Sequence, residues 1–123
     1  MTEERRFTVD EANLLLPSLR ESLVRVQKAR QVILDGGRRI RRSAPTNGGG
    51  AFGKEYLDAL STLRRDVESI TGQGIVLRDA ESGLLDFPTT RDGREVFLCW
   101  RLGEDEVGFW HGPEGGFAGR KPV

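Results

Sequence analysis

Two stretches of the chain repeat the same spacing of apolar residues, and a glycine-rich segment separates them. In the first stretch the apolar residues follow at intervals of 4, 3, 4, 3 and 7, interrupted only by Arg30. In the second the intervals are 4, 3, 4 and 3. Such heptad spacing lines one side of an α-helix with apolar side chains, so we predict two helices that pack through these sides. The residues are Ala12, Leu16, Leu19, Leu23, Val26 and Ile33 in the first helix, and Tyr56, Leu60, Leu63, Val67 and Ile70 in the second.

The start of the first helix is marked by a capping box at residues 8–11. Thr8 accepts from the amide of Glu11, and the Glu11 carboxylate reaches back to the amide of Thr8. Pro17 has no backbone N–H, which predicts a kink or a short break near Asn13. The first helix can end at Gly36 and Gly37, although residues 38–42 can continue it.

The segment at residues 43–53 is rich in Gly, Pro and Asn, which is typical of a flexible linker. The second helix follows at residues 54–71, with Gly72 as its C-terminal cap. Two helices joined in this way form an antiparallel hairpin over residues 8–72. A bare hairpin leaves its outer sides uncovered, so we expect the C-terminal segment or a second subunit to pack on it.

Residues 74–123 have the pattern of an antiparallel β-meander. Short apolar runs at residues 75–78, 84–87, 95–102 and 107–111 are separated by turn residues. Residues 112–119 then form a C-terminal strap anchored by Phe117. The fold class predicted is α+β: one domain, 1–123, made of a long helical hairpin and a small antiparallel sheet of three to four strands.

The turns also predict the register of the sheet. A two-residue loop at Asp92 and Gly93 sets one hairpin, and a loop at Glu104 and Asp105 sets the next. The expected pairs are Phe87 with Leu98, Asp86 with Cys99, Leu98 with His111, Cys99 with Trp110, and Arg78 with Leu84. The face expected against the helices carries Ile75, Leu77, Leu85, Phe87, Val96, Leu98, Trp100, Phe109 and His111, and the opposite face carries Arg78, Asp86, Phe97, Cys99, Arg101 and Trp110.

The composition excludes several classes of protein. Nineteen basic and nineteen acidic residues give a formal net charge of zero, which disfavours nucleic acid or an anionic membrane as the main partner. The basic run Arg38–Arg42 lacks interleaved aromatic residues, so we interpret it as a solvated helix end. A single cysteine, no signal peptide and no long apolar run predict a cytoplasmic protein without a membrane span.

The single cysteine, Cys99, and the single histidine, His111, lie in one short stretch with both tryptophans. They are ligand types for a metal, together with Glu104, Asp79 and Asp86. In the expected register, however, the cysteine and the histidine point to opposite faces of the sheet. We therefore predict neither a metal site nor a cysteine nucleophile with a histidine base, and no cofactor.

Charged side chains offer a second candidate site. Asp86 lies diagonal to both Arg78 and Arg101 in the expected register, which fits structural ion pairs. The functional interpretation is an arginine-lined pocket for an anion beside Trp110. Arg120 joins it if residues 115–119 fold back. The candidate ligand-binding residues are Arg78, Asp86, Arg101, Trp110, His111 and Arg120.

Several motifs resemble one family. They are F-T-x-x-E-A-N at residues 7–13, L-R-D at 77–79, G-L-L-D-F-P at 83–88, L-C-W-R-L-G-E at 98–104, W-H at 110–111 and G-F-A-G-R at 116–120. By these motifs the chain resembles a family of uncharacterised prokaryotic proteins catalogued as domain of unknown function 2203. The family has no established activity, so the resemblance implies a family and no function.

The sequence leaves three hypotheses for function. The first is a non-enzymatic homodimeric binding or adaptor module, because the helical seams are coherent and no catalytic constellation stands out. The second is a sensor of a small anionic molecule, or a small enzyme, that uses Arg78, Asp86, Arg101 and His111. The third is a nucleic-acid accessory protein that uses Arg38–Arg42.

Overall fold

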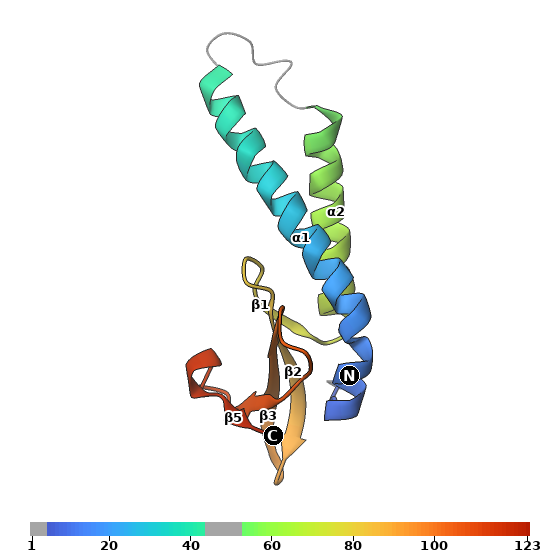
Figure 1. Cartoon of the computed structure of the whole chain (residues 1–123), viewed down its shortest axis with the longest axis vertical. Helices are drawn as coiled ribbons and strands as arrows, with labels where there is room; N and C mark the ends of the chain where they lie inside the picture. Colours follow the sequence, from blue (N-terminus) through green and yellow to red (C-terminus); the bar gives the residue numbers. More distant parts are fainter. Residues whose placement is uncertain (1–4, 44–52) are drawn as a thin grey trace, which may run out of the picture.

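The computed structural model describes residues 5–43 and 53–123, with the backbone alone for residues 39–43. Two long helices lie side by side, and an antiparallel sheet of five strands in the order β1-β2-β3-β4-β5 packs at one end of them (Figure 1). The helical hairpin extends well beyond the sheet (Figure 1). The α+β fold class is therefore confirmed, with one more strand than the highest number predicted.

Helix α1 (Val9–Ser43) begins at the predicted capping box. The amide of Thr8 donates to Glu11 Oε1 at 2.8 Å, and the amide of Glu11 donates to Thr8 Oγ1 at 3.0 Å. The helix continues through Pro17, so a break there is wrong. Leu16 and Leu19, on either side of the proline, are buried in the core, and their packing offsets the lost hydrogen bond.

Helix α2 (Lys54–Gly72) matches the predicted range to within one residue. The predicted cap is wrong, because Gly72 is still helical and Gln73 is the C-cap. The left-handed backbone conformation falls two residues later, at Gly74 with φ 91°. The amide of Gly74 donates to the carbonyl of Thr71 at 3.0 Å, and this bond closes the last turn.

The sheet consists of β1 (Val76–Asp79), β2 (Leu84–Arg91), β3 (Arg94–Arg101), β4 (Phe109–His111) and β5 (Lys121–Pro122). The register predicted for β2 and β3 is confirmed: Asp86 pairs with Cys99 and Phe87 with Leu98. Arg78 was expected opposite Leu84, but a bulge in β1 puts Asp79 there instead. The strand missing from the prediction is β5, which is only two residues long.

The register predicted for β3 and β4 is wrong by one residue. His111 pairs with Phe97, Trp110 with Leu98 and Phe109 with Cys99. A slip of one residue moves every side chain of a strand to the other face of the sheet. Trp110 therefore lies on the face toward the helices, the inner face, and His111 and Phe109 lie on the outer face.

The core lies between the inner face of the sheet and the N-terminal half of α1. Phe7 contacts Phe87 edge to face, with ring centroids 5.4 Å apart, and its amide donates to the carbonyl of Pro88 at 2.8 Å. Trp100 is fully buried. The buried residues of this cluster are Phe7, Ala12, Leu16, Leu19, Leu23, Ile70, Ile75, Leu85, Phe87, Leu98, Trp100 and Val107. Among the described residues, no helix has the combination of length and apolar character needed to cross a bilayer.

Candidate functional site

The structure does not bring the six candidate residues together in one site. Arg78, Asp86 and His111 meet on the outer face of the sheet. Arg101 and Arg120 lie to one side, where both contact the ring of Phe117. Trp110 lies on the opposite face, as the register of β4 requires. The candidate residues therefore divide into three groups.

The first group is centred on Asp86, whose side chain is only 2% exposed. Its Oδ2 accepts from Arg78 Nε at 2.6 Å and lies 2.9 Å from Nε2 of His111. Its other oxygen, Oδ1, is buried without a hydrogen-bond partner among the described residues. The pairing of Arg78 with Asp86 was expected, whereas the contact with His111 follows from the shifted register.

Cys99 belongs to the same group, which we call the Asp86 cluster (Arg78, Asp86, Cys99 and His111). Cys99 Sγ, a nitrogen of His111 and a carboxylate oxygen of Asp86 lie within 4.8 Å of one another, and all three residues are buried. The expectation that the cysteine and the histidine face apart is thus wrong. A nucleophilic role is disfavoured for a different reason: burial, reinforced by the negative charge of Asp86, raises the pKa of the Cys99 thiol to about 12.

The C-terminal strap runs over this part of the outer face. The ring of Phe117 contacts the guanidinium groups of Arg101 and Arg120, at 4.7 and 4.5 Å from the ring centroid. Arg120 in turn donates to Glu104 Oε2 at 2.6 Å, which anchors the strap to the turn after β3. A pocket of about 280 Å³ is left beneath the strap, with Asp86 and His111 in its lining.

Trp110 lines a separate pocket of about 590 Å³ at the far end of the inner face. Arg91 Cζ lies 4.7 Å from the centroid of the indole ring, and Lys121 Nζ lies 5.2 Å from it. Arg94 lines the same pocket. An arginine-lined pocket beside Trp110 is therefore present, but its cations are not those expected from the sequence.

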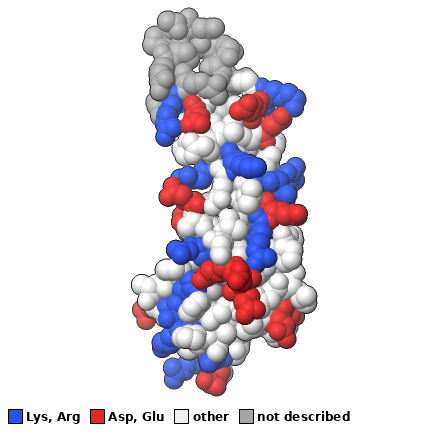
Figure 2. All heavy atoms as spheres, in the orientation of Figure 1, with Lys and Arg blue, Asp and Glu red and all other residues white. Residues whose placement is uncertain are grey.

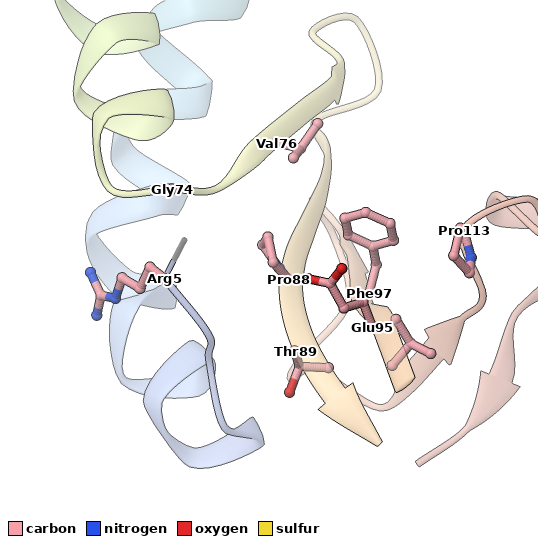
Figure 3. A pocket seen from close by; sticks show the side chains of 9 residues that line it. Arg5, Gly74, Val76, Pro88, Thr89, Glu95, Phe97 and Pro113 are labelled. Atoms are coloured by element: carbon pink, nitrogen blue, oxygen red, sulfur yellow. The ribbon is translucent and has the colours of Figure 1, made fainter. Parts of the chain in front are cut away.

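A third, more apolar pocket of about 460 Å³ lies where the N-terminal segment crosses the edge of the sheet. Figure 3 shows Val76, Pro88 and Phe97 around it, with Arg5 on the side of the helices. Phe97 separates this pocket from the Asp86 cluster, because its ring stacks on His111 at 5.5 Å and lies 5.0 Å from the guanidinium of Arg78.

Comparison with family models finds a match over residues 5–123 to a family described as Uncharacterized conserved protein (DUF2203). The match covers nearly the whole chain.

The chain belongs to the DUF2203 family. No curated protein and no solved structure matches it. Membership confirms the resemblance carried by the sequence motifs. It assigns no role to the Asp86 cluster or to the pocket beside Trp110, so the function of each has to be argued from its geometry.

The residues that sequence reasoning missed are Arg91, Arg94 and Lys121. Two features could have identified these residues as neighbours in the pocket. Arg91 and Arg94 flank the Asp92-Gly93 turn, and Lys121 pairs with Trp110 across β4 and β5. The second feature depends on recognising β5, and a two-residue strand has no periodicity to detect.

The basic run at the end of α1 is described only at its first residue. Arg38 donates to Asp35 Oδ1 at 2.9 Å, so its charge is partly balanced within the helix. The side chains of residues 39–42 lie outside the described residues. On the face shown in Figure 2, acidic and basic side chains are intermixed over both the helices and the sheet.

Proposed function

We propose that the chain is a non-enzymatic binding protein whose sheet holds a small anionic molecule in the pocket beside Trp110. The observation that carries this proposal is that Arg91, Arg94 and Lys121 line one pocket, and none of them forms an ion pair with an acid among the described residues. Two cations at the indole of Trp110 and a third in the lining of the same pocket favour a negatively charged ligand.

The acids of this pocket do not cancel that preference. Glu95 lines the pocket but pairs with Arg6 from the segment before α1. Asp92 is the remaining acid, in the turn between β2 and β3. Arg91 and Arg94 are directly opposite each other across that turn, and like charges in this position destabilise a sheet. A bound anion relieves this repulsion.

The chemistry of the lining defines the class of ligand. The planar fork of an arginine matches a carboxylate or a phosphate through two parallel hydrogen bonds. The indole of Trp110 adds a flat apolar surface next to the charges. An anion that carries a ring or another flat apolar group uses both features.

The test is a thermal-shift screen of the full chain with inorganic phosphate, a mononucleotide and an aromatic carboxylate. We expect at least one of them to stabilise the protein, and Arg91→Ala and Lys121→Ala to weaken its binding about tenfold or more, since a charged hydrogen bond contributes about 1.5–3 kcal/mol. Arg64→Ala is the control, because Arg64 pairs with Glu68 on the exposed side of α2. Absence of binding by all three, or equal binding by every variant, overturns the proposal.

Self-association in a reducing cytoplasm belongs to the same proposal. Leu14 is 81% exposed and Leu57 is 55% exposed, which leaves apolar helix surface that a second copy can cover. The single cysteine is buried and has no disulfide partner, which suits a reducing compartment. We expect light scattering at high micromolar concentration to give a dimer, and a mass of 13.7 kDa there contradicts self-association.

A further inference from the structure

We propose that Asp86, Cys99 and His111 are the ligands of a transition-metal ion, of which Zn²⁺ is the best match, bound beneath the C-terminal strap. This site lies on the outer face of the sheet and does not depend on the anion pocket at Trp110. The argument rests on three features of the Asp86 cluster: the separation of the ligand atoms, the orientation of His111, and the free oxygen of Asp86.

The ligand atoms are close enough to share one ion. The three atoms lie within 4.8 Å of one another on three adjacent strands, β2, β3 and β4. Bonds of about 2.0–2.3 Å in tetrahedral geometry separate two ligand atoms by about 3.3–3.8 Å. His111 Nε2 lies 2.9 Å from Asp86 Oδ2, and the ligand atoms are at most 4.8 Å apart, so shifts of about 1 Å or less bring them to this spacing.

His111 is already oriented as a metal ligand. Its Nδ1 lies 2.7 Å from the carbonyl oxygen of Gly112, which can only accept a hydrogen bond, so Nδ1 carries a proton. The other nitrogen, Nε2, then faces a carboxylate. Metal-binding histidines are typically held in this way, with one nitrogen donating to a carbonyl and the other on the ion.

The contact between His111 and Asp86 brings two acceptors together. Nε2 of a ring with Nδ1 protonated is an acceptor, and so is Asp86 Oδ2 at 2.9 Å. A cation bound by both groups satisfies them, so a metal ion fits this contact.

The free oxygen of Asp86 is the third feature that points to a metal ion. Its Oδ1 is buried and has no hydrogen-bond partner among the described residues, whereas Oδ2 is held by Arg78. An unpaired carboxylate oxygen in the interior is costly, and coordination to a cation satisfies it. Arg78 then orients the ligating carboxylate from outside, as outer partners of metal ligands do.

The donor set favours a borderline metal over Mg²⁺ or Ca²⁺. One thiolate, one imidazole and one carboxylate are ligands of Zn²⁺ and its neighbours, whereas Mg²⁺ and Ca²⁺ require oxygen. Three protein ligands leave the fourth position open, and the pocket of about 280 Å³ at Asp86 and His111 provides room for water there. Loading releases the proton of the Cys99 thiol.

The experiment uses the full chain without a histidine tag, reduced, stripped with a chelator, and titrated with Zn²⁺ against a competing chromophoric chelator. The chain has one histidine and one cysteine, so the binding of either side chain is assigned without ambiguity. We expect one ion per chain and the release of at least one proton per ion near neutral pH, from the Cys99 thiol.

Variants separate the proposed ligands from bystanders. Cys99→Ala and His111→Gln should each weaken binding by at least about 100-fold, and Arg78→Gln by about 10-fold, the lower end of the range for an outer partner. Asp79→Asn is the matched control: Asp79 is an exposed carboxylate at the end of β1 that accepts from the amide and the hydroxyl of Ser82, and its loss should leave the affinity for Zn²⁺ unchanged. Far-UV circular dichroism of each metal-free variant checks that it folds.

Co²⁺ provides a measurement on the unaltered chain in case a variant does not fold. We expect a thiolate-to-cobalt absorption band that disappears when Zn²⁺ is added. The proposal is overturned if the chain binds no stoichiometric ion at micromolar concentration, if the cobalt complex lacks a thiolate band, or if binding persists in the Cys99 and His111 variants.

Discussion

The two ends of the molecule are held together by different means. At one end, the N-terminal half of α1 is packed against the sheet and the end of α2, around Trp100, Phe87 and Leu16. Farther along the hairpin, α1 and α2 pack on each other (Figure 1). The sheet also contacts α1 there, since Gln27 donates to the carbonyl of Glu81 and Arg30 pairs with the Glu81 carboxylate in the turn after β1. Apolar burial contributes less to stability at the hairpin end. An ion pair with a buried aspartate and a close approach of the two helices contribute there instead.

The ion pair at the hairpin end joins Arg25 and Asp66. Arg25 donates to both carboxylate oxygens, at 2.9 and 3.0 Å, and the Asp66 side chain is only 5% exposed. Farther along, the backbone of Gly36 is so close to α2 that a Cβ there would lie 2.3 Å from a ring carbon of Tyr56. The comparison shows that one heptad pattern can support an apolar core at one end of a hairpin. At the other end, the same pattern brings the helices together around an ion pair and a glycine contact.

The largest effect is expected at the sheet end. Trp100→Ala removes a fully buried side chain from the centre of the core, and we expect the free energy of unfolding to fall by about 3–5 kcal/mol. Denaturant unfolding measures it. Ser61→Ala, at an exposed position of α2, should change stability by less than about 0.5 kcal/mol. Similar losses for the two variants would contradict the difference between the ends.

At the hairpin end, Asp66→Ala should destabilise the protein by about 1–3 kcal/mol, because it leaves the guanidinium of Arg25 without its buried partner. The cost stays below that of a fully buried pair, since Arg25 is half-exposed and can bind water. Asp58→Ala removes an exposed i,i+4 pair with Lys54 on the same helix and should cost less than about 0.5 kcal/mol. Equal costs would show that the buried pair does not stabilise this end.

Gly36→Ala tests the close approach of the helices. An alanine in a helix is ordinarily more stable than glycine by about 1 kcal/mol, but here its Cβ collides with Tyr56, and we expect a net loss of about 1–2 kcal/mol. Gly72→Ala, where nothing lies within 4 Å of the new Cβ, is the matched control and should be neutral or stabilising. Thermal unfolding distinguishes the outcomes, and a stabilising Gly36→Ala would show that the helices are farther apart.

The pH dependence of the hairpin end gives the smallest effect. Hydrogen bonds from Arg25 hold the pKa of Asp66 below its ordinary value. The unfolded state therefore binds the proton more tightly, and the stability contributed by the pair is present above about pH 4 and lost as the pH falls through the lowered pKa. The difference in unfolding free energy between the parent chain and Asp66→Asn should shrink over this range. A difference that stays constant with pH would exclude the linkage.

The first hairpin of the sheet was predictable from local chemistry. Asp92 and Gly93 both have positive φ, 52° and 76°, as a two-residue turn between antiparallel strands requires. Such a turn leaves one register available, so the pairing of Asp86 with Cys99 followed from the sequence. The start of α1 was predictable for the same reason, since the capping box satisfies the backbone within a few residues.

The second hairpin was not predictable, because distant residues hold its loop. Two residues of α1 bond to the loop. Asn13 Oδ1 accepts from the amide of Val107 at 2.7 Å, and Arg20 donates to the carbonyl of Asp105 at 2.6 Å. Trp100 Nε1 also donates to the carbonyl of Glu104 at 3.1 Å. No turn motif specifies these contacts, and together they shift β4 by one residue from the register of a short loop.

The sequence by itself determined the two helices, the antiparallel sheet, the first register and the family, because short-range spacing and turn geometry specify each of them. Only the tertiary structure decided which face His111 and Trp110 occupy. The physical reason is the two-residue period of a strand: one residue of slip, set by contacts of the loop with α1, exchanges the faces. That slip brings His111 to Asp86 and Cys99, and Trp110 to Arg91 and Lys121.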